Sequence, residues 1–157
     1  MRNQCVCRDR QTATGKCLSF EMPASEANIQ VIVNCALHFL QGEGMLEQHA
    51  VAVVMRELLA NAVVHGSATR SDARVRGEMT VKHGGSIEIW VEDEGRGFDY
   101  QALDLRLPAD QPDSLRQRGL ILVKALVQDL SWNEPGNRVT VQLHSEGERR
   151  GKHGSSR

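Results

Sequence analysis

Two short segments carry the side chains best suited to chemistry. In the first, Glu57, Asn61 and His65 follow one another at intervals of four residues, so on a helix they lie along one narrow stripe. A carboxylate such as Glu57 can accept the proton of an attacking hydroxyl group or water. A carboxamide oxygen one turn later suits Mg²⁺, which binds few protein ligands together with water and phosphate oxygens. This segment predicts a general base beside a metal ligand, although hydrogen-bonded polar residues at a helix rim give the same pattern.

The second segment is an acid followed by two glycines, Asp93, Gly95 and Gly97, directly after an apolar strand. At the end of that strand the Asp93 carboxylate is expected to be partly desolvated, and it can accept a hydrogen bond from an exocyclic amine such as that of adenine. The glycines permit positive φ angles and a close approach of the backbone to a ligand. Alone, this pattern is also typical of an acidic turn. The two segments in this order and spacing together predict a nucleotide site.

Hydrophobic periodicity predicts the elements that position these segments. Apolar residues recur at helical spacing over residues 25–40 and 46–65, with Ser25 as the expected N-cap of the first helix and Gly66 as the stop of the second. Strands are predicted at residues 16–22, 79–82, 86–92, 131–133 and 139–143, and a third helix at residues 119–130. Residues 100–117 are rich in Asp, Pro and Arg and predict a loop or lid.

This order of strands and helices predicts an α+β fold, a two-layer sandwich in which helices cover one face of a mixed sheet. The folded domain is expected at residues 16–144. It would lie between a flexible N-terminus at residues 1–15 and a charged, Gly- and Ser-rich disordered tail at residues 145–157.

Composition argues against several function classes. The chain has 157 residues, 40% of them hydrophobic and 25% charged, with a formal net charge of -1, which is typical of one soluble domain without global attraction to nucleic acid or anionic membranes. It has no apolar run of about 18 residues and no signal-peptide core, so we expect a cytoplasmic protein without a membrane span. There the four cysteines stay reduced, and Cys5-x-Cys7 is a poor match to zinc spacing.

The two segments resemble the N box and the first glycine box of the GHKL (Bergerat-fold) ATP-binding domain, which gyrase, MutL and histidine kinases share. Arg118-Gly119-Leu120, followed by an apolar helix, resembles the second glycine box. Residues 136–141, which include Thr140, resemble the closing turn and strand. The resemblance covers roughly residues 17–144. Within this superfamily the short chain is similar to the anti-sigma-factor serine/threonine-protein kinases.

The resemblance implies ATP and Mg²⁺ as cofactors and a role for each matching residue. Glu57 is expected as the general base, Asn61 as the Mg²⁺ ligand and Asp93 as the anchor of the adenine base. The remaining expected nucleotide-binding residues are Gly95, Gly97, Arg118, Gly119 and Thr140.

One residue departs from the family pattern. Gln117 stands where the second glycine box usually has its first glycine, and its side chain there would crowd the triphosphate or require a different path for the lid. Arg116 and Arg118 can compensate by pairing with phosphate oxygens. Trp90 and Trp132 are expected to be packing residues rather than stacking platforms.

For function, the resemblance implies an ATP-dependent serine/threonine-protein kinase that acts as an anti-sigma factor in a partner-switching system. It would phosphorylate a STAS-domain antagonist (an anti-anti-sigma factor), hold a sigma factor or another target inactive, and form a homodimer. The alternatives are a non-catalytic, nucleotide-responsive regulator that binds a partner, and a detached ATPase domain of a histidine kinase. His65 ends the site helix without a helical hairpin before it, so it is expected at the pocket rim rather than as a phosphoacceptor.

Overall fold

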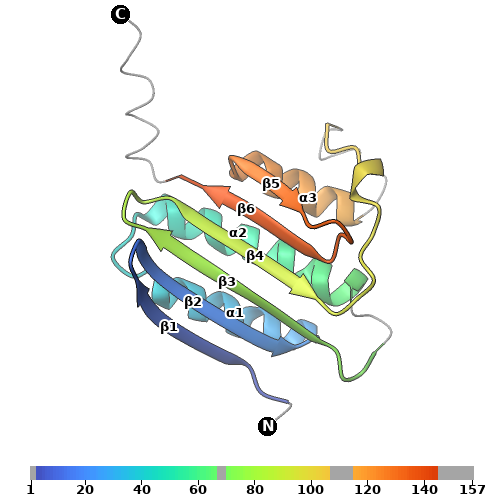
Figure 1. Ribbon diagram of the computed structural model, residues 1–157, viewed down its shortest axis with the longest axis horizontal. Coiled ribbons are helices and arrows are strands. Elements are labelled where there is room, and N and C mark those ends of the chain that lie inside the picture. The colour runs from blue at the N-terminus through green and yellow to red at the C-terminus, as the bar shows by residue number, and fades with distance from the viewer. Residues whose placement is uncertain (1–2, 67–69, 107–114, 145–157) are drawn as a thin grey trace, which may run out of the picture.

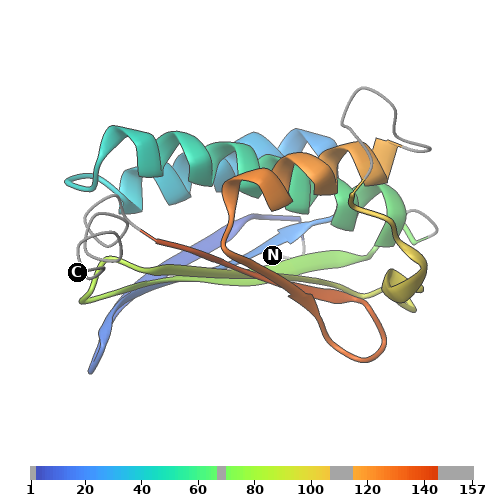
Figure 2. The same cartoon turned by 90° about the horizontal axis from the view of Figure 1, so that it is seen from above.

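The computed structural model describes residues 3–66, 70–106 and 115–144. These residues form two layers, a six-stranded sheet and a layer of α-helices that covers one of its faces (Figures 1 and 2). The sheet has the strand order β1-β2-β3-β4-β6-β5, and all five pairings between neighbours are antiparallel. The predicted two-layer α+β architecture is confirmed, but the described sheet is antiparallel throughout rather than mixed.

The described elements have the following bounds. The strands are β1 (Val6–Thr12), β2 (Gly15–Pro23), β3 (Arg74–Lys82), β4 (Ile87–Asp93), β5 (Asp129–Trp132) and β6 (Arg138–Leu143). The α-helices are α1 (Glu26–Phe39), α2 (Met45–Asn61) and α3 (Leu115–Leu126). A π-helical turn, Ala62–Gly66, continues α2, and a 3₁₀ turn, Tyr100–Ala102, follows the loop after β4.

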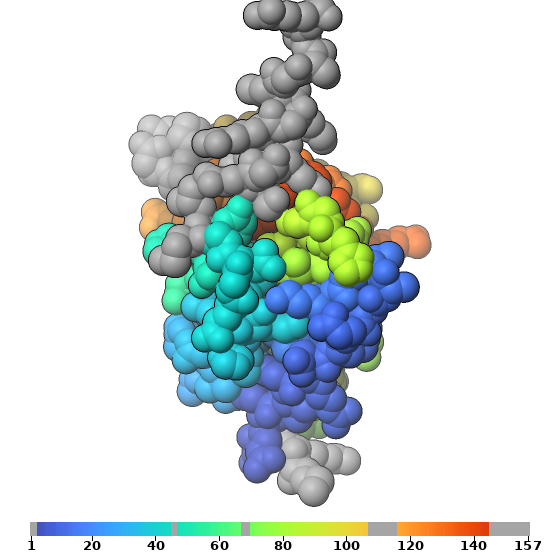
Figure 3. Space-filling model, turned by 90° about the vertical axis from the view of Figure 1, so that its left-hand side faces the viewer, coloured from blue at the N-terminus to red at the C-terminus, as the bar shows by residue number. Residues whose placement is uncertain are grey.

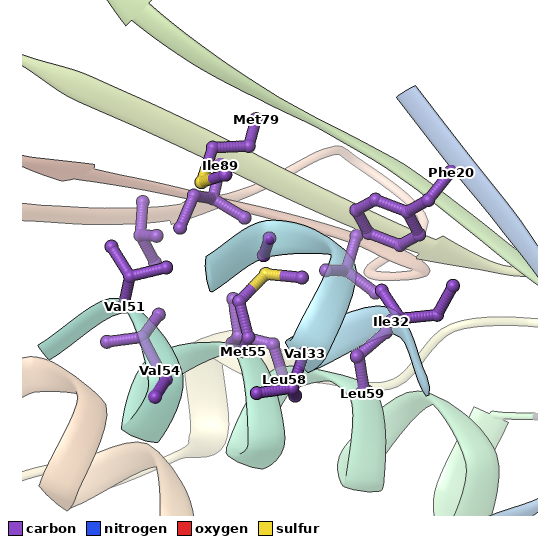
Figure 4. Close-up of a cluster of buried hydrophobic side chains, with 14 of the residues drawn as sticks. Phe20, Ile32, Val33, Val51, Val54, Met55, Leu58, Leu59, Met79 and Ile89 are labelled. Atoms are coloured by element: carbon purple, nitrogen blue, oxygen red, sulfur yellow. The ribbon is translucent and has the colours of Figure 1, made fainter. Parts of the chain in front are cut away.

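The hydrophobic core lies between the sheet and the helices. Along each strand alternate side chains point to opposite faces, and the inward set is apolar: Val75, Met79 and Val81 on β3 are buried, as are Ile87, Ile89 and Val91 on β4. Figure 4 shows Phe20, Met79 and Ile89 from the sheet packing against α1 and α2. This core fixes the position of the last turn of α2 relative to the end of β4.

The other face of the sheet is largely polar, and several of its charges are paired. Glu92 on β4 accepts hydrogen bonds from Arg76 on β3 and from Arg138 on β6, the latter at 2.7 Å from Nε to Oε2. Arg138 also lies over the ring of Trp90, 4.0 Å from its centroid. Paired charges of this kind are compatible with a solvated surface. Trp90 is therefore a packing residue, as the sequence predicts.

Three element bounds differ from the prediction for physical reasons. Residues 6–12 form β1 instead of a flexible segment: Cys7 packs against the core, while Arg8 and Arg10 lie on the opposite face of this edge strand. Helix α3 begins at residue 115 rather than 119 and ends before β5 starts at residue 129, so Gly119 lies inside the helix. Strand β3 begins at Arg74 rather than at the predicted residue 79. The predicted tail at residues 145–157 and part of the predicted lid, residues 107–114, lie outside the described residues.

The cysteines are free thiols. Burial, and to a lesser extent a hydrogen bond with Cys35, raises the pKa of the Cys7 thiol to about 12. Little of the reactive thiolate is therefore present at neutral pH. Among the described residues no group of three or more Cys, His, Asp or Glu side chains is placed to hold a metal ion. In the same part of the chain, no helix has both the length and the apolar character that crossing a membrane requires.

Figure 3 shows the end of the molecule where the β1–β2 turn, the β3–β4 turn and the α1–α2 connection meet. His83 in the β3–β4 turn donates its backbone N–H to the carbonyl of Thr14 in the β1–β2 turn, at 2.8 Å. The end of α2, the end of β4, the start of α3 and the β5–β6 turn gather at the opposite end, on the right of Figure 1. That end carries the residues that the sequence selects.

Candidate functional site

The last turns of α2 bring the first predicted segment to the site. Glu57 and Asn61 lie one turn apart, with Asn61 as the last residue of α2, and His65 follows in the π-helical turn. Such single π turns are frequent at functional sites. The turn ends at Gly66, where a Cβ would overlap the carboxylate of Asp93. Gly66 therefore lets the end of the helix and the end of β4 meet.

The Asp93 carboxylate is held by the loop that follows it. Its Oδ1 accepts a hydrogen bond from the backbone N–H of Gly95 at 2.7 Å, and Asn137 in the β5–β6 turn bonds both backbone groups of Asp93 at 3.0 and 3.2 Å. Burial raises the pKa of Asp93, while the Gly95 N–H and the charge of Arg116 oppose that rise. The result is a fixed, partly desolvated acid at the end of an apolar strand, as the sequence predicts.

The glycines shape this loop rather than line a cavity. Gly97 has a φ of 83°, a left-handed conformation that favours glycine. A Cβ at Gly97 would overlap the carbonyl of Pro135, and a Cβ at Gly95 would overlap the carbonyl of Gly66. The two glycines thus let the loop after β4 pack between the π-helical turn and the β5–β6 turn.

A small cavity, called here the inner cavity, opens beside Asp93 with a volume of about 40 Å³. Its walls come from α2, β4, α3, β5, β6 and the loops at this end of the molecule. Its lining combines apolar core side chains with Asn61, Asp93, Arg116 and Asn137. The lining residues are Leu58, Asn61, Ala62, Val91, Asp93, Phe98, Arg116, Leu120, Trp132, Gly136, Asn137 and Val139.

A second, larger cavity, called here the outer cavity, lies between α2 and α3 and has a volume of about 300 Å³. Its polar lining residues are Glu57, Asn61, His65 and Arg118. Burial, and to a lesser extent the charge of Arg116, lowers the pKa of His65, which favours the neutral imidazole. Asn61 lines both cavities. The inner cavity, which is lined by the Asp93 carboxylate, therefore adjoins the larger outer cavity, and the Asn61 amide lies where the two meet.

That amide lacks a partner. Asn61 Nδ2 is buried and has no hydrogen-bond partner among the described residues. A buried polar group without a partner costs about 1–3 kcal/mol and calls for an explanation such as a ligand. A half-turn of the amide exchanges its nitrogen and oxygen, so the same position can offer Oδ1 to a cation.

The absence of a side chain at Gly119 determines where the Glu57 carboxylate lies in the outer cavity. Because Gly119 lies in the second turn of α3, its missing side chain leaves room for the Glu57 carboxylate, which a Cβ there would overlap. The predicted start of this helix at residue 119 is therefore wrong. The described start of α3 lies one turn earlier, at residue 115.

Two further expectations need correction. Thr140 does not reach the cavity: its neighbours Val139 and Val141 point inward, so Thr140 points to the polar face, opposite Trp90 and Ser131. Gln117 does not crowd either cavity. It is buried and its Nε2 donates to the carbonyl of Asp104 at 2.5 Å, which ties α3 to the segment directly after the 3₁₀ turn.

Several lining residues are absent from the sequence prediction. Phe98, Tyr100 and Trp132 form an aromatic cluster at the inner cavity, with Tyr100 and Trp132 stacked at 5.5 Å between ring centroids. The sequence predicts only packing for Trp132, yet it also lines the cavity. Half of the six aromatic residues of the chain converge here, and the position of Phe98 directly after the glycine segment is the one hint that the sequence offers.

Comparison with known proteins identifies the family to which the chain belongs. A family model described as the histidine kinase-like ATPase domain matches residues 22–143. The anti-sigma F factor of Priestia megaterium is 34% identical over 55 residues, which make up 35% of this chain and 37% of that protein. The chain thus spans little more than a third of that relative's length.

Among solved structures, the histidine kinase domain of the blue-light activated histidine kinase of Erythrobacter litoralis matches with a TM-score of 0.53 and 20% sequence identity. The match covers 82% of this chain and 64% of that chain, and at this identity it shows the fold alone. The GHKL resemblance seen in the sequence is confirmed by the family match, which covers well over half of the residues. The chain belongs to the histidine kinase-like ATPase domain family.

Proposed function

We propose that this protein is an ATP-dependent serine/threonine-protein kinase that acts as an anti-sigma factor and phosphorylates a STAS-domain antagonist. The family supports nucleotide chemistry, and the match to an anti-sigma F factor supports this branch of the family. The observation that carries the proposal is the unpartnered amide of Asn61, which lies where the inner and outer cavities meet.

The inner cavity supplies the contacts that a purine base requires. Asp93 offers a carboxylate to the exocyclic amine, in apolar surroundings that strengthen a hydrogen bond. Phe98 and Trp132 offer aromatic surface to the base. A nucleotide with its base at Asp93 and its phosphates in the outer cavity passes directly beside Asn61.

The outer cavity supplies contacts for phosphate and metal. Arg118 is exposed there and can pair with phosphate oxygens. We assign Asn61 Oδ1 as a ligand of Mg²⁺, which needs only one or two protein ligands when phosphate oxygens complete its shell. In Mg-ATP, the ATP supplies the phosphoryl group and the Mg²⁺ neutralises part of the charge of its phosphates.

Glu57 is the proposed general base. Its carboxylate lines the outer cavity next to Gly119, where a serine or threonine hydroxyl of a protein substrate can approach from solvent. Phosphoryl transfer depends mainly on positioning and charge stabilisation. Holding the hydroxyl and removing its proton are therefore the contributions that Glu57 makes.

Asn61→Ala is expected to weaken Mg-ATP binding by about tenfold or more, because it removes one ligand of a charged group. The same change is expected to leave the thermal unfolding temperature unchanged or higher, since the amide that it removes has no partner within the described protein. Calorimetric titration with ATP and Mg²⁺ together with a thermal melt measures both. A lower unfolding temperature with unchanged ATP affinity would mean that Asn61 is a structural residue.

The proposed reaction is tested with a purified STAS-domain protein, ATP labelled at the γ-phosphate and Mg²⁺. We expect label on the STAS protein in a form that survives acid, as phosphoserine and phosphothreonine do, and that disappears when the acceptor residue is replaced by alanine. Acid-labile label would point instead to the histidine-kinase alternative. Binding of ATP and of the STAS protein without any transfer would favour the non-catalytic regulator. Size-exclusion chromatography with light scattering tests the proposed homodimer.

A further inference from the structure

The side chain of Arg116 forms one wall of the inner cavity, although the sequence gives it only a possible phosphate contact. Arg116 lies in the first turn of α3, and its guanidinium carbon is 4.2 Å from the centroid of the Phe98 ring. It is half-buried and lines the cavity together with Asp93. Arg116 is thus stacked on an aromatic face next to a carboxylate.

The cavity beside Arg116 is too small for a base in this conformation. Its volume of about 40 Å³ has room for about three water molecules, whereas small-molecule sites usually measure about 300–1,000 Å³. Three of the apolar walls cannot retreat, because Leu58, Val91 and Leu120 are 1–2% exposed and belong to the core. Arg116 is the long, polar side chain among the walls, and it can leave for solvent without opening the core.

The contacts of Arg116 are also those that a purine base would make. A guanidinium group is planar, stacks on aromatic rings and donates hydrogen bonds, and a purine with an exocyclic amine does the same. Burial lowers the pKa of Arg116, while the nearby Asp93 carboxylate raises it, in agreement with a cation drawn into a partly desolvated site. The backbone next to it is anchored by the hydrogen bond from Gln117 to the carbonyl of Asp104, so rotation of the side chain is the simplest way to clear the space.

We infer that Arg116 competes with the purine base for the inner cavity and thereby sets the affinity of the site. This inference rests on the proposed nucleotide function and adds a regulatory residue to it. Stacking of Arg116 on Phe98 and binding of the base exclude each other. The contacts that the base makes must therefore compensate for the contacts that Arg116 loses when it leaves the cavity.

Adenosine is the probe that separates this role from a phosphate contact, because adenosine carries a base but no phosphate. Arg116→Ala is expected to tighten adenosine binding by about tenfold, the equivalent of one lost cation–π contact. The matched control is Arg56→Ala, which removes an exposed arginine from α2 outside both cavities and is expected to leave adenosine affinity unchanged. Calorimetric titration of the full chain with adenosine, and separately with ATP and Mg²⁺, measures the affinities.

The outcomes are distinct. Tighter adenosine binding in Arg116→Ala alone supports competition. Unchanged adenosine binding with weaker ATP binding overturns it and leaves Arg116 as a phosphate contact, with the nucleotide function intact. If neither the wild-type chain nor the variant binds ATP or adenosine, both the inference and the proposed function fail. Should Arg116→Ala lose its far-UV circular dichroism, Arg116→Gln, which is shorter and uncharged, is read by the same criteria.

Discussion

Replacement of Glu57 by glutamine is expected to lower phosphoryl transfer to the STAS-domain protein by about 10²- to 10⁴-fold, the range that a positioned general base contributes. Glutamine has the same shape, so it fits the space that Gly119 leaves for the carboxylate, but it cannot take the proton of the attacking hydroxyl. Single-turnover transfer from labelled ATP measures the chemical step. Affinity for ATP, measured by calorimetry, is expected to stay within about threefold, because the base contacts and the metal ligand remain.

The matched control is Glu26→Gln on the exposed first turn of α1, which changes net charge by the same amount at a residue that lines neither cavity. It is expected to transfer phosphate at the wild-type rate. Transfer by Glu57→Gln within a few-fold of wild type would remove Glu57 as the base. Equal losses of transfer and of ATP affinity would instead make Glu57 part of the binding site.

The parts of the site that could be predicted from the sequence are those with a local signal. Glu57 and Asn61 are four residues apart on a strongly periodic helix, so their common face follows from helix geometry alone. Asp93 follows a strand with strict alternation, so its position at the end of that strand is equally local. The core that brings these two elements together needs only their apolar faces.

The errors occurred where local signals were ambiguous. The resemblance implies that Thr140 binds nucleotide, but on a strand a displacement of one residue changes the face, and Val139 lines the cavity instead. Gly119 suggested a helix start, yet its missing side chain serves to accommodate Glu57 inside α3. The contact between Arg116 and Phe98 joins residues from separate elements, and no periodicity or motif of one sequence encodes such a pair.

Asp93→Asn is expected to weaken adenine-nucleotide binding by about 10- to 100-fold and to stabilise the fold at neutral pH. The loss of affinity follows because the amide presents an N–H donor toward the exocyclic amine in place of an acceptor, and a hydrogen bond to a charged group contributes about 1.5–3 kcal/mol. The gain in stability follows because burial raises the pKa of Asp93 above its ordinary value of 3.8. Asparagine can still accept the hydrogen bond from the Gly95 N–H through its Oδ1.

The sign of the pH dependence follows from that raised pKa. Well below pH 3.8 the carboxyl group is protonated in the folded and unfolded chains alike, so it has no effect on stability. As pH rises through the folded-state pKa, the folded protein must ionise a desolvated group, and the free energy of unfolding of the wild-type chain falls relative to Asp93→Asn. Urea denaturation at pH 4.5 and pH 7 should therefore show the larger advantage of the variant at pH 7. Asp129→Asn, at an exposed position of β5, should show no such trend. The contrary result is an Asp93→Asn variant that is less stable than wild type at pH 7, with a deficit that grows as pH rises. It would mean that the contacts of the carboxylate with Gly95 and Arg116 outweigh the cost of burying it. Asp93 would then stabilise the fold rather than serve ligand binding.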